Sequence, residues 1–317
     1  MPAFHTLGRP DRNTLLAVML LFVPLPGLGQ VPARPPAGET EESISVETNL
    51  VVVPVSVRDA KQRFVPGLTL QHFRLTEDRT PQQILSFRAT EHPFVAAILL
   101  DTSGSMERKL SLVRAACANF IEGLRPGDRF TLFSFGNGRV RQLQGFTEGQ
   151  EIADALWDLE ARGQTPLYDA IKQATEALAQ QPEERRVLLV VSDGADTESR
   201  ASFDEVLRRS LEAHLVVYAV DLSDQAVFGR SAGPDNTSAL RDLASRSGGQ
   251  FFRSPGGSLL RDAFAATIEE LHHQYTLTYQ PTQDRLDGRW RRIEVQVDRP
   301  GLQVRSRQGY WARKRAR

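Results

Sequence analysis

The stretch that decides the fold is Val95–Met106, VAAILLDTSGSM, where an apolar run ends in an aspartate followed by small hydroxyl residues. Polar residues do not interrupt the run, so a strand formed here is covered on both of its faces. A second apolar run, Val187–Val191, also leads into an aspartate, Asp193. Strands of this kind are typical of a mostly parallel sheet with helices on both sides.

Strand and helix patterns alternate between residues 93 and 272, which predicts one doubly wound α/β domain there. The expected strands are Val95–Leu100, Phe130–Phe135, Val187–Ser192, His214–Val220 and a weaker one at Gly249–Phe252. The expected helices are Met106–Leu124, Gly149–Leu159, Leu167–Gln180, Phe203–Ala213, Ser238–Arg246 and Leu259–Leu271. In such a sheet, ligands bind beyond the carboxyl ends of the strands.

The segments on either side of this domain read as β structure. Apolar residues alternate with others at Val51, Val53, Val55 and Val57, and a similar alternation follows Ile293. Residues 43–92 and 273–310 are each too small to form an independent core. We therefore expect them to pair into one small β unit, with the α/β domain inserted between them.

The two ends of the sequence carry different signals. Residues 1–29 have a basic start, a short apolar middle and a small-residue end, which predicts a secretory signal peptide and a secreted or periplasmic protein. The apolar run is short for a membrane span, so no span is expected after cleavage, and residues 30–42 read as a flexible linker. Basic residues gather near the C-terminus, and residues 311–317 are expected as a basic tail.

The amino-acid composition narrows the classes of protein to which this sequence can belong. The 317 residues are 40% hydrophobic and 25% charged, with 39 basic and 39 acidic side chains, as in an ordinary globular protein. No basic motif with interleaved aromatic residues points to nucleic acid. The single cysteine, Cys117, falls at helical spacing among apolar residues and is expected to be a buried hydrophobe.

The candidate site gathers residues from three loops at the carboxyl edge of the predicted sheet. Its members are hydroxyl and carboxylate side chains with no histidine or thiolate: Asp101, Ser103, Ser105, Thr165 and Asp193. Oxygen ligands of this kind suit hard cations, here Mg²⁺, with Mn²⁺ and Ca²⁺ as alternatives. A cation surrounded by so few protein charges, with one coordination position open, would attract a carboxylate from a protein partner.

This pattern resembles the metal-ion-dependent adhesion site of von Willebrand factor A domains. That site has D-x-S-x-S after an apolar strand, then a threonine before a helix, then an aspartate after a later strand. The resemblance covers residues 93–271 and implies that Ser103, Ser105 and Thr165 are direct ligands, with Asp101 and Asp193 acting mainly through water. The flanks resemble a bacterial secreted group related to these domains, on the stretches VPGLTLQHFRLTEDRTPQQI and YTLTYQPTQDRLDGRWRRIEVQVDRPGLQVRSRQGYWA.

Other interpretations of the same residues account for fewer of them together. An aspartic protease needs two facing Asp-Thr/Ser-Gly turns, but Ser103 interrupts the first and no second copy exists. Singly, each site residue could instead cap a helix. Asp169 is expected to serve the first turn of its own helix and Asp196 to be solvated. The adjacent His272 and His273 lack a third ligand for zinc.

The sequence therefore predicts a non-enzymatic, exported binding module that engages an acidic residue of a partner in adhesion or in assembly of an envelope or extracellular complex. One alternative is a scaffold whose cation is structural. A metal-dependent hydrolase is a further alternative, which would need a general base that the motif loops do not supply.

Overall fold

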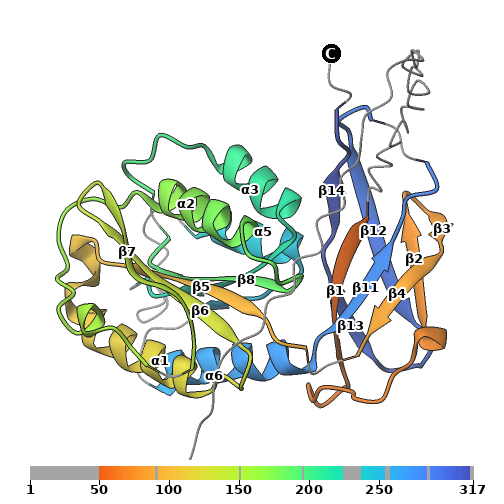
Figure 1. Cartoon of the computed structure of the whole chain (residues 1–317), viewed down its shortest axis with the longest axis horizontal. Coiled ribbons are helices and arrows are strands. Elements are labelled where there is room, and N and C mark those ends of the chain that lie inside the picture. Colours follow the sequence, from red (N-terminus) through yellow and green to blue (C-terminus); the bar gives the residue numbers. More distant parts are fainter. Residues whose placement is uncertain are drawn as a thin grey trace, which may run out of the picture. The chain divides into compact units, whose positions relative to one another are not determined.

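The computed structural model describes residues 50–89, 92–149, 151–194, 196–223, 237–253, 258–283 and 286–314. Its largest sheet has six strands in the order β10-β9-β8-β5-β6-β7 (Figure 1). The bounds are β5 Val95–Asp101, β6 Arg129–Gly136, β7 Arg139–Glu148, β8 Arg186–Ser192, β9 Leu215–Asp221 and β10 Phe251–Arg253. All neighbours are parallel except β6 and β7, which are antiparallel.

Helices cover both faces of this sheet, as Figure 1 shows. They are α1 Leu110–Glu122, α2 Leu167–Ala179, α3 Phe203–Glu212, α5 Ser238–Ser247 and α6 Ser258–His273. Successive residues of a strand face opposite sides, so Ile98 packs in the core with α1 and α6, and Leu99 packs in the core with α2, α3 and α5. Both residues are fully buried, which explains why the sequence of β5 shows no polar alternation.

One expected helix is wrong. The described residues 149 and 151–159 contain only a short 3-10 turn, η3 (Asp154–Leu156), and the preceding residues form the unexpected edge strand β7. The reason lies in the local backbone and in one side chain. Gly149 has a φ of 94°, and the Gln144 side chain binds two backbone groups of the next segment: the carbonyl of Glu151 at 2.8 Å and the N–H of Ala153 at 2.9 Å. These bonds hold the segment along β7 instead of letting it coil.

Strands from both ends of the described chain pair with one another in two four-stranded sheets. The first has the order β13-β1-β11-β4 and the second β14-β12-β2-β3. Their strands are β1 Val51–Arg58, β2 Phe73–Glu77, β3 Thr80–Gln82, β4 Ile84–Arg88, β11 Tyr275–Tyr279, β12 Trp290–Val297, β13 Gln303–Ser306 and β14 Gly309–Trp311, with the 3-10 turn η1 at Leu70–His72. We call this part the β unit. Val53 and Leu277, which face each other across β1 and β11, are both fully buried in its core.

A buried carboxylate joins the β unit to α6. Glu270 is fully buried and accepts hydrogen bonds from Ser56 Oγ at 2.7 Å and Tyr218 OH at 2.7 Å. It also forms ion pairs with Arg58, at 3.2 Å, and with Arg305. Burial alone would raise the pKa of Glu270, but the charge and hydrogen bonds of Arg305 bring that pKa below its ordinary value. The carboxylate therefore stays charged and holds strands β1 and β13 against the helix.

The guanidinium of Arg307 forms a second connection. It is buried and donates to the carbonyl of Val52 at 3.2 Å and to the carbonyl of Leu211 at 3.0 Å. It also lies 2.9 Å from Nδ1 of His214. Burial, followed by the charge of Arg307, lowers the pKa of His214 to about 3, so the ring is neutral and its Nδ1 accepts a hydrogen bond from the guanidinium.

The two ends of the chain differ in what the structure describes. Residues 1–49, which include the expected signal peptide and linker, lie outside the described residues. Within the described ranges, no helix is long and apolar enough to cross a membrane. The expected basic tail begins inside β14, because Trp311 ends that strand and its ring packs edge-on against Trp290 at 4.7 Å between centroids.

Candidate functional site

Asp101 is the last residue of β5 and its carboxylate is completely buried. One oxygen, Oδ1, accepts the backbone N–H of Ser103 at 2.8 Å, and Oδ2 accepts the hydroxyl of Ser192 at 2.5 Å. Burial raises the pKa of Asp101 to about 6, against the hydrogen bonds from Ser192 and Ser103, and the charge of Asp193 raises it further. The site thus places a poorly solvated carboxylate at the carboxyl edge of the sheet.

The two motif serines lie in the turn that follows. Ser103 precedes the 3-10 segment η2 (Gly104–Lys109), which leads directly into α1. Its hydroxyl lies 3.1 Å from the hydroxyl of Ser105, so the two oxygens lie within hydrogen-bond distance of each other. Ser103 is buried and Ser105 is exposed, which places the pair at the boundary between the sheet edge and solvent.

The loop that carries Thr165 is hydrogen-bonded to this turn. The N–H of Arg162 donates to the carbonyl of Thr102 at 2.8 Å, and the N–H of Gly104 donates to the carbonyl of Gly163 at 3.1 Å. Gly163 also lies close to Asn137, which follows β6. Its φ is 71°, and a Cβ there would lie 2.5 Å from Oδ1 of Asn137, so only glycine allows the loop to approach Asn137 this closely. Thr165 itself is buried just before α2.

The third loop completes the set. Asp193 follows β8, and the adjacent Ser192, which sequence reasoning treated only as a strand residue, links β8 to Asp101. This loop also contacts the second one, because the N–H of Thr165 donates to Thr197 Oγ1 at 2.9 Å and the N–H of Thr197 donates to the carbonyl of Thr165 at 3.0 Å. The three loops that sequence reasoning grouped are therefore connected to one another at the sheet edge.

These side chains have the chemistry that a hard cation requires. Oδ1 of Asp193 is buried without a hydrogen-bond partner, which is costly unless a cation or another donor satisfies it. Neither Asp101 nor Asp193 forms an ion pair with any described residue. No group of three or more His, Cys, Asp or Glu side chains in the described chain could hold a metal, so a cation here would depend on the hydroxyls.

Two neighbouring carboxylates, Asp169 and Asp196, have roles different from those expected. Asp196, expected to be solvated, accepts the N–H of Tyr168 at 3.2 Å and so caps the first turn of α2. Asp169 lies in that first turn, but its oxygens accept the N–H groups of Arg200 at 3.1 Å and Ala201 at 2.9 Å. Both aspartates thus position the loop that follows Asp193.

The two adjacent histidines and the single cysteine contact only structural groups of the described protein. His272 is buried with its Nε2 atom 3.0 Å from Asp128, and His273 stacks on Phe64 at 5.1 Å between ring centroids. They contact different elements, as expected for residues that do not form a metal pair. Cys117 is fully buried, and burial raises the pKa of its thiol to about 12, which confirms its expected role as a core residue.

Comparison with known proteins identifies the α/β domain. Residues 96–195 match the profile of the von Willebrand factor type A domain family. An uncharacterized protein of Pseudomonas aeruginosa is 27% identical over 169 residues, which cover 46% of this chain but only 28% of that relative. The prediction of a von Willebrand A-like domain is confirmed in that region.

Two solved structures are similar to this chain at low sequence identity. Proximal thread matrix protein 1 from the mussel byssus has a TM-score of 0.50 and 14% identity, with 62% of this chain and 51% of that chain covered. A von Willebrand factor type A protein from Catenulispora acidiphila has a TM-score of 0.49 and 13% identity, with 84% and 75% covered. The expected α/β fold, a mostly parallel sheet between helices, is confirmed.

Proposed function

We propose that this protein is a binding module that engages an acidic side chain of a protein partner through a divalent cation, Mg²⁺ in the first instance. Asp101, Ser103, Ser105, Thr165 and Asp193 would hold the cation, with the two carboxylates supplying the only formal negative charges. When bound, the cation supplies a positive centre with room for one more oxygen ligand. The buried, unpartnered Oδ1 of Asp193 is the observation that carries this proposal.

The contribution of the protein is to hold the oxygens in place before binding. Ser192 fixes one oxygen of Asp101, and the N–H of Ser103 fixes the other. The Thr165 loop is held by hydrogen bonds to both neighbouring loops. Such preorganisation lowers the entropy cost of assembling a ligand shell. The three loops contain neither histidine nor cysteine, so we propose binding and not catalysis as the role of the site.

Cation binding is tested by titrating Mn²⁺ or Mg²⁺ into the purified protein and measuring heat by calorimetry. Ser103→Ala removes one proposed ligand and should abolish the specific heat, whereas Ser111→Ala, which alters an exposed serine on α1, should leave the heat unchanged. Equal heats for both variants and for the unaltered protein would refute the assignment.

Partner binding is tested by a pull-down from envelope or extracellular extract in magnesium and in EDTA. A partner that is retained in magnesium, released in EDTA and not captured by Ser103→Ala supports the proposal. If EDTA lowers the melting temperature without releasing the partner, the cation is structural and the protein acts as a scaffold. Export, which we propose from residues 1–29, is tested by N-terminal sequencing of the mature protein.

A further inference from the structure

A pocket of about 370 Å³ opens directly beside the motif turn. Its floor is formed by Thr102, which precedes Ser103, and by Ser134 and Gly136 of β6. The register of β6 and β7 places Ser134 opposite Arg141 and Gly136 opposite Arg139. Residues opposite each other in a sheet share a face, so both arginines project from the face that forms the floor. The volume falls within the range of ordinary ligand pockets.

The wall of the pocket is fixed in place. It consists of residues 155–162, which include the buried Leu159. The carbonyl of Leu159 accepts a hydrogen bond from Arg114 of α1, and the N–H of Arg162 donates to the carbonyl of Thr102 at 2.8 Å. On the floor, a Cβ at Gly136 would lie 2.6 Å from the same carbonyl, so the strand and the motif turn are in close contact. The pocket is therefore preformed.

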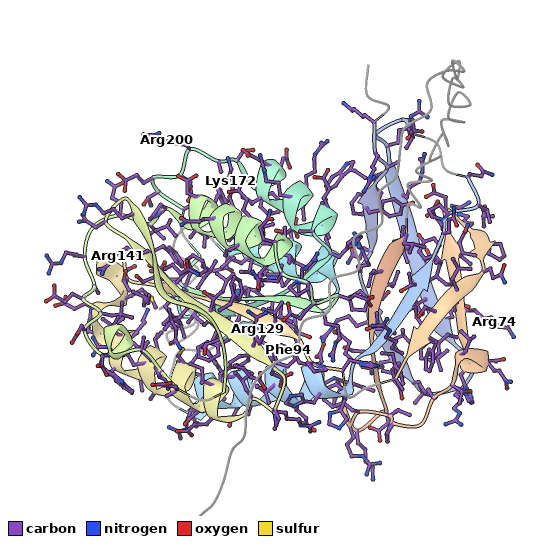
Figure 2. The ribbon with its side chains drawn as sticks, in the orientation of Figure 1. Arg74, Phe94, Arg129, Arg141, Lys172 and Arg200 are labelled. Atoms are coloured by element: carbon purple, nitrogen blue, oxygen red, sulfur yellow. The ribbon has the colours of Figure 1, made fainter. Side chains whose placement is uncertain are left out.

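The charges in the pocket are unevenly compensated. The side chains of Arg139 and Arg141 are exposed, and their guanidinium groups have no hydrogen-bond or ion-pair partner among the described residues. Figure 2 shows Arg141 at the outer edge of the α/β domain, on β7. Of the two acidic residues that line the pocket, Glu160 pairs with Arg162, and Asp158 is exposed. Beside the Glu160–Arg162 pair, the pocket thus has two further guanidinium groups and one further carboxylate, which leaves one net positive charge for an anion from outside. A guanidinium suits a carboxylate in particular.

We infer that this pocket is a second anion subsite, which binds another carboxylate of the same acidic partner segment that reaches the cation. The inference rests on the proposed function. Thr102 is adjacent to Ser103 in the chain, and an extended peptide advances about 3.3 Å per residue. Because Thr102 and both arginines line the same pocket, we expect a second acidic residue two to four positions from the metal-bound one to reach Arg139 or Arg141. The partner class is a segment with two spaced acidic residues, not a single aspartate or glutamate.

The test uses synthetic glycine-based peptides that contain either one aspartate or one aspartate plus a glutamate two, three or four positions to either side. Dissociation constants are measured by NMR titration in magnesium and in EDTA. In magnesium, the best two-acid peptide should bind about fivefold more tightly than the one-acid peptide, as expected for two partly exposed ion pairs. Added salt should reduce this advantage.

Two double variants separate the pocket from general charge. Arg139→Gln/Arg141→Gln should remove the advantage of the second acid and leave one-acid binding unchanged. The control, Arg200→Gln/Arg261→Gln, removes the same charge from exposed positions that do not line the pocket, and the advantage should persist. Figure 2 shows Arg200 well separated from Arg141.

The other outcomes distinguish the two proposals. If the one-acid peptide binds in magnesium but the second acid adds nothing, the subsite is overturned and the cation site stands. If the two-acid peptide binds equally well in EDTA through the arginines, the proposed function fails and the joint recognition inferred here fails with it. If neither peptide binds under any condition, both proposals are overturned.

Discussion

Replacing Glu270 with glutamine should destabilise the protein by about 3 kcal/mol, because it removes the charge that two arginines share. The glutamine has the same size and can still accept from Ser56 and Tyr218. Breaking a buried ion pair costs roughly 3–5 kcal/mol. The side chains of Arg58 and Arg305 are 20% and 31% exposed, so water partly compensates them and the lower end of that range applies.

The loss is measured by urea denaturation and by thermal melting. For a protein of this size, 3 kcal/mol corresponds to a decrease of about 5 °C in Tm. The matched control is Glu269→Gln, one residue earlier on the exposed side of α6, which should change stability by less than about 0.5 kcal/mol. A loss below about 1 kcal/mol for Glu270→Gln would show that the carboxylate does not hold the β unit against α6.

The pH dependence gives an independent check of the same reasoning. The pKa of Glu270 is lowered in the folded protein, because the charge and hydrogen bonds of Arg305 outweigh the opposing effect of burial. Its stabilisation is therefore fully present above the ordinary carboxyl pKa of 4.5 and is lost as the pH falls below that value. The stability difference between the unaltered protein and Glu270→Gln should shrink in acid. A difference that stays constant from pH 7 to pH 3 would contradict the assignment.

Three further predictions concern other described residues. Ser192→Ala should cost about 2 kcal/mol by leaving Oδ2 of the buried Asp101 without the hydroxyl donor, and an unchanged urea midpoint would contradict this. Gly136→Ala should cost about 1–3 kcal/mol, because the added carbon would lie 2.6 Å from a backbone oxygen; melting of the variant tests this, and equal stability would mean that the strand can shift freely. The pKa of His214 is lowered from 6.5 to about 3, so the folded protein takes up fewer protons and loses about 2 kcal/mol between pH 7 and pH 5. His214→Asn should flatten that slope, as measured by urea melts at each pH, whereas an equal slope would assign it to other groups.

The sequence predicted the inner strands well because their apolar residues are continuous. Val95–Leu100 and Val187–Ser192 were expected within one residue of β5 and β8, since only a sheet covered on both faces buries such runs. The edge strand β7 was not predicted, because its side chains are partly exposed and two arginines interrupt its apolar pattern. Ile152, Leu156 and Leu159 have helical spacing, but the bonds made by Gln144 prevail locally.

At the candidate site, the sequence predicted which loops meet but not how they are held. The order of Asp101, Thr165 and Asp193 along the chain, combined with the expected sheet, was enough to place their loops at one edge. The contribution of Ser192 depends on a contact between residues 91 positions apart, and a serine at the end of a strand gives no local signal of it. The hydrogen bonds of Asp169 and Asp196 likewise depend on the path of the loop between β8 and α3.

The pairing of the two flanks gives the molecule a definite order of assembly. Val51 of β1 faces Tyr279 of β11, so this contact cannot form until nearly the entire chain is available. The sheet that contains the motif has shorter connections and needs no residue from the flanks. During synthesis, the segment that forms β1 therefore stays unpaired while the inserted domain folds. In that period its apolar backbone can pair with strands of other chains. Strands β11 and β13, which are synthesised late, are the ones that pair with β1.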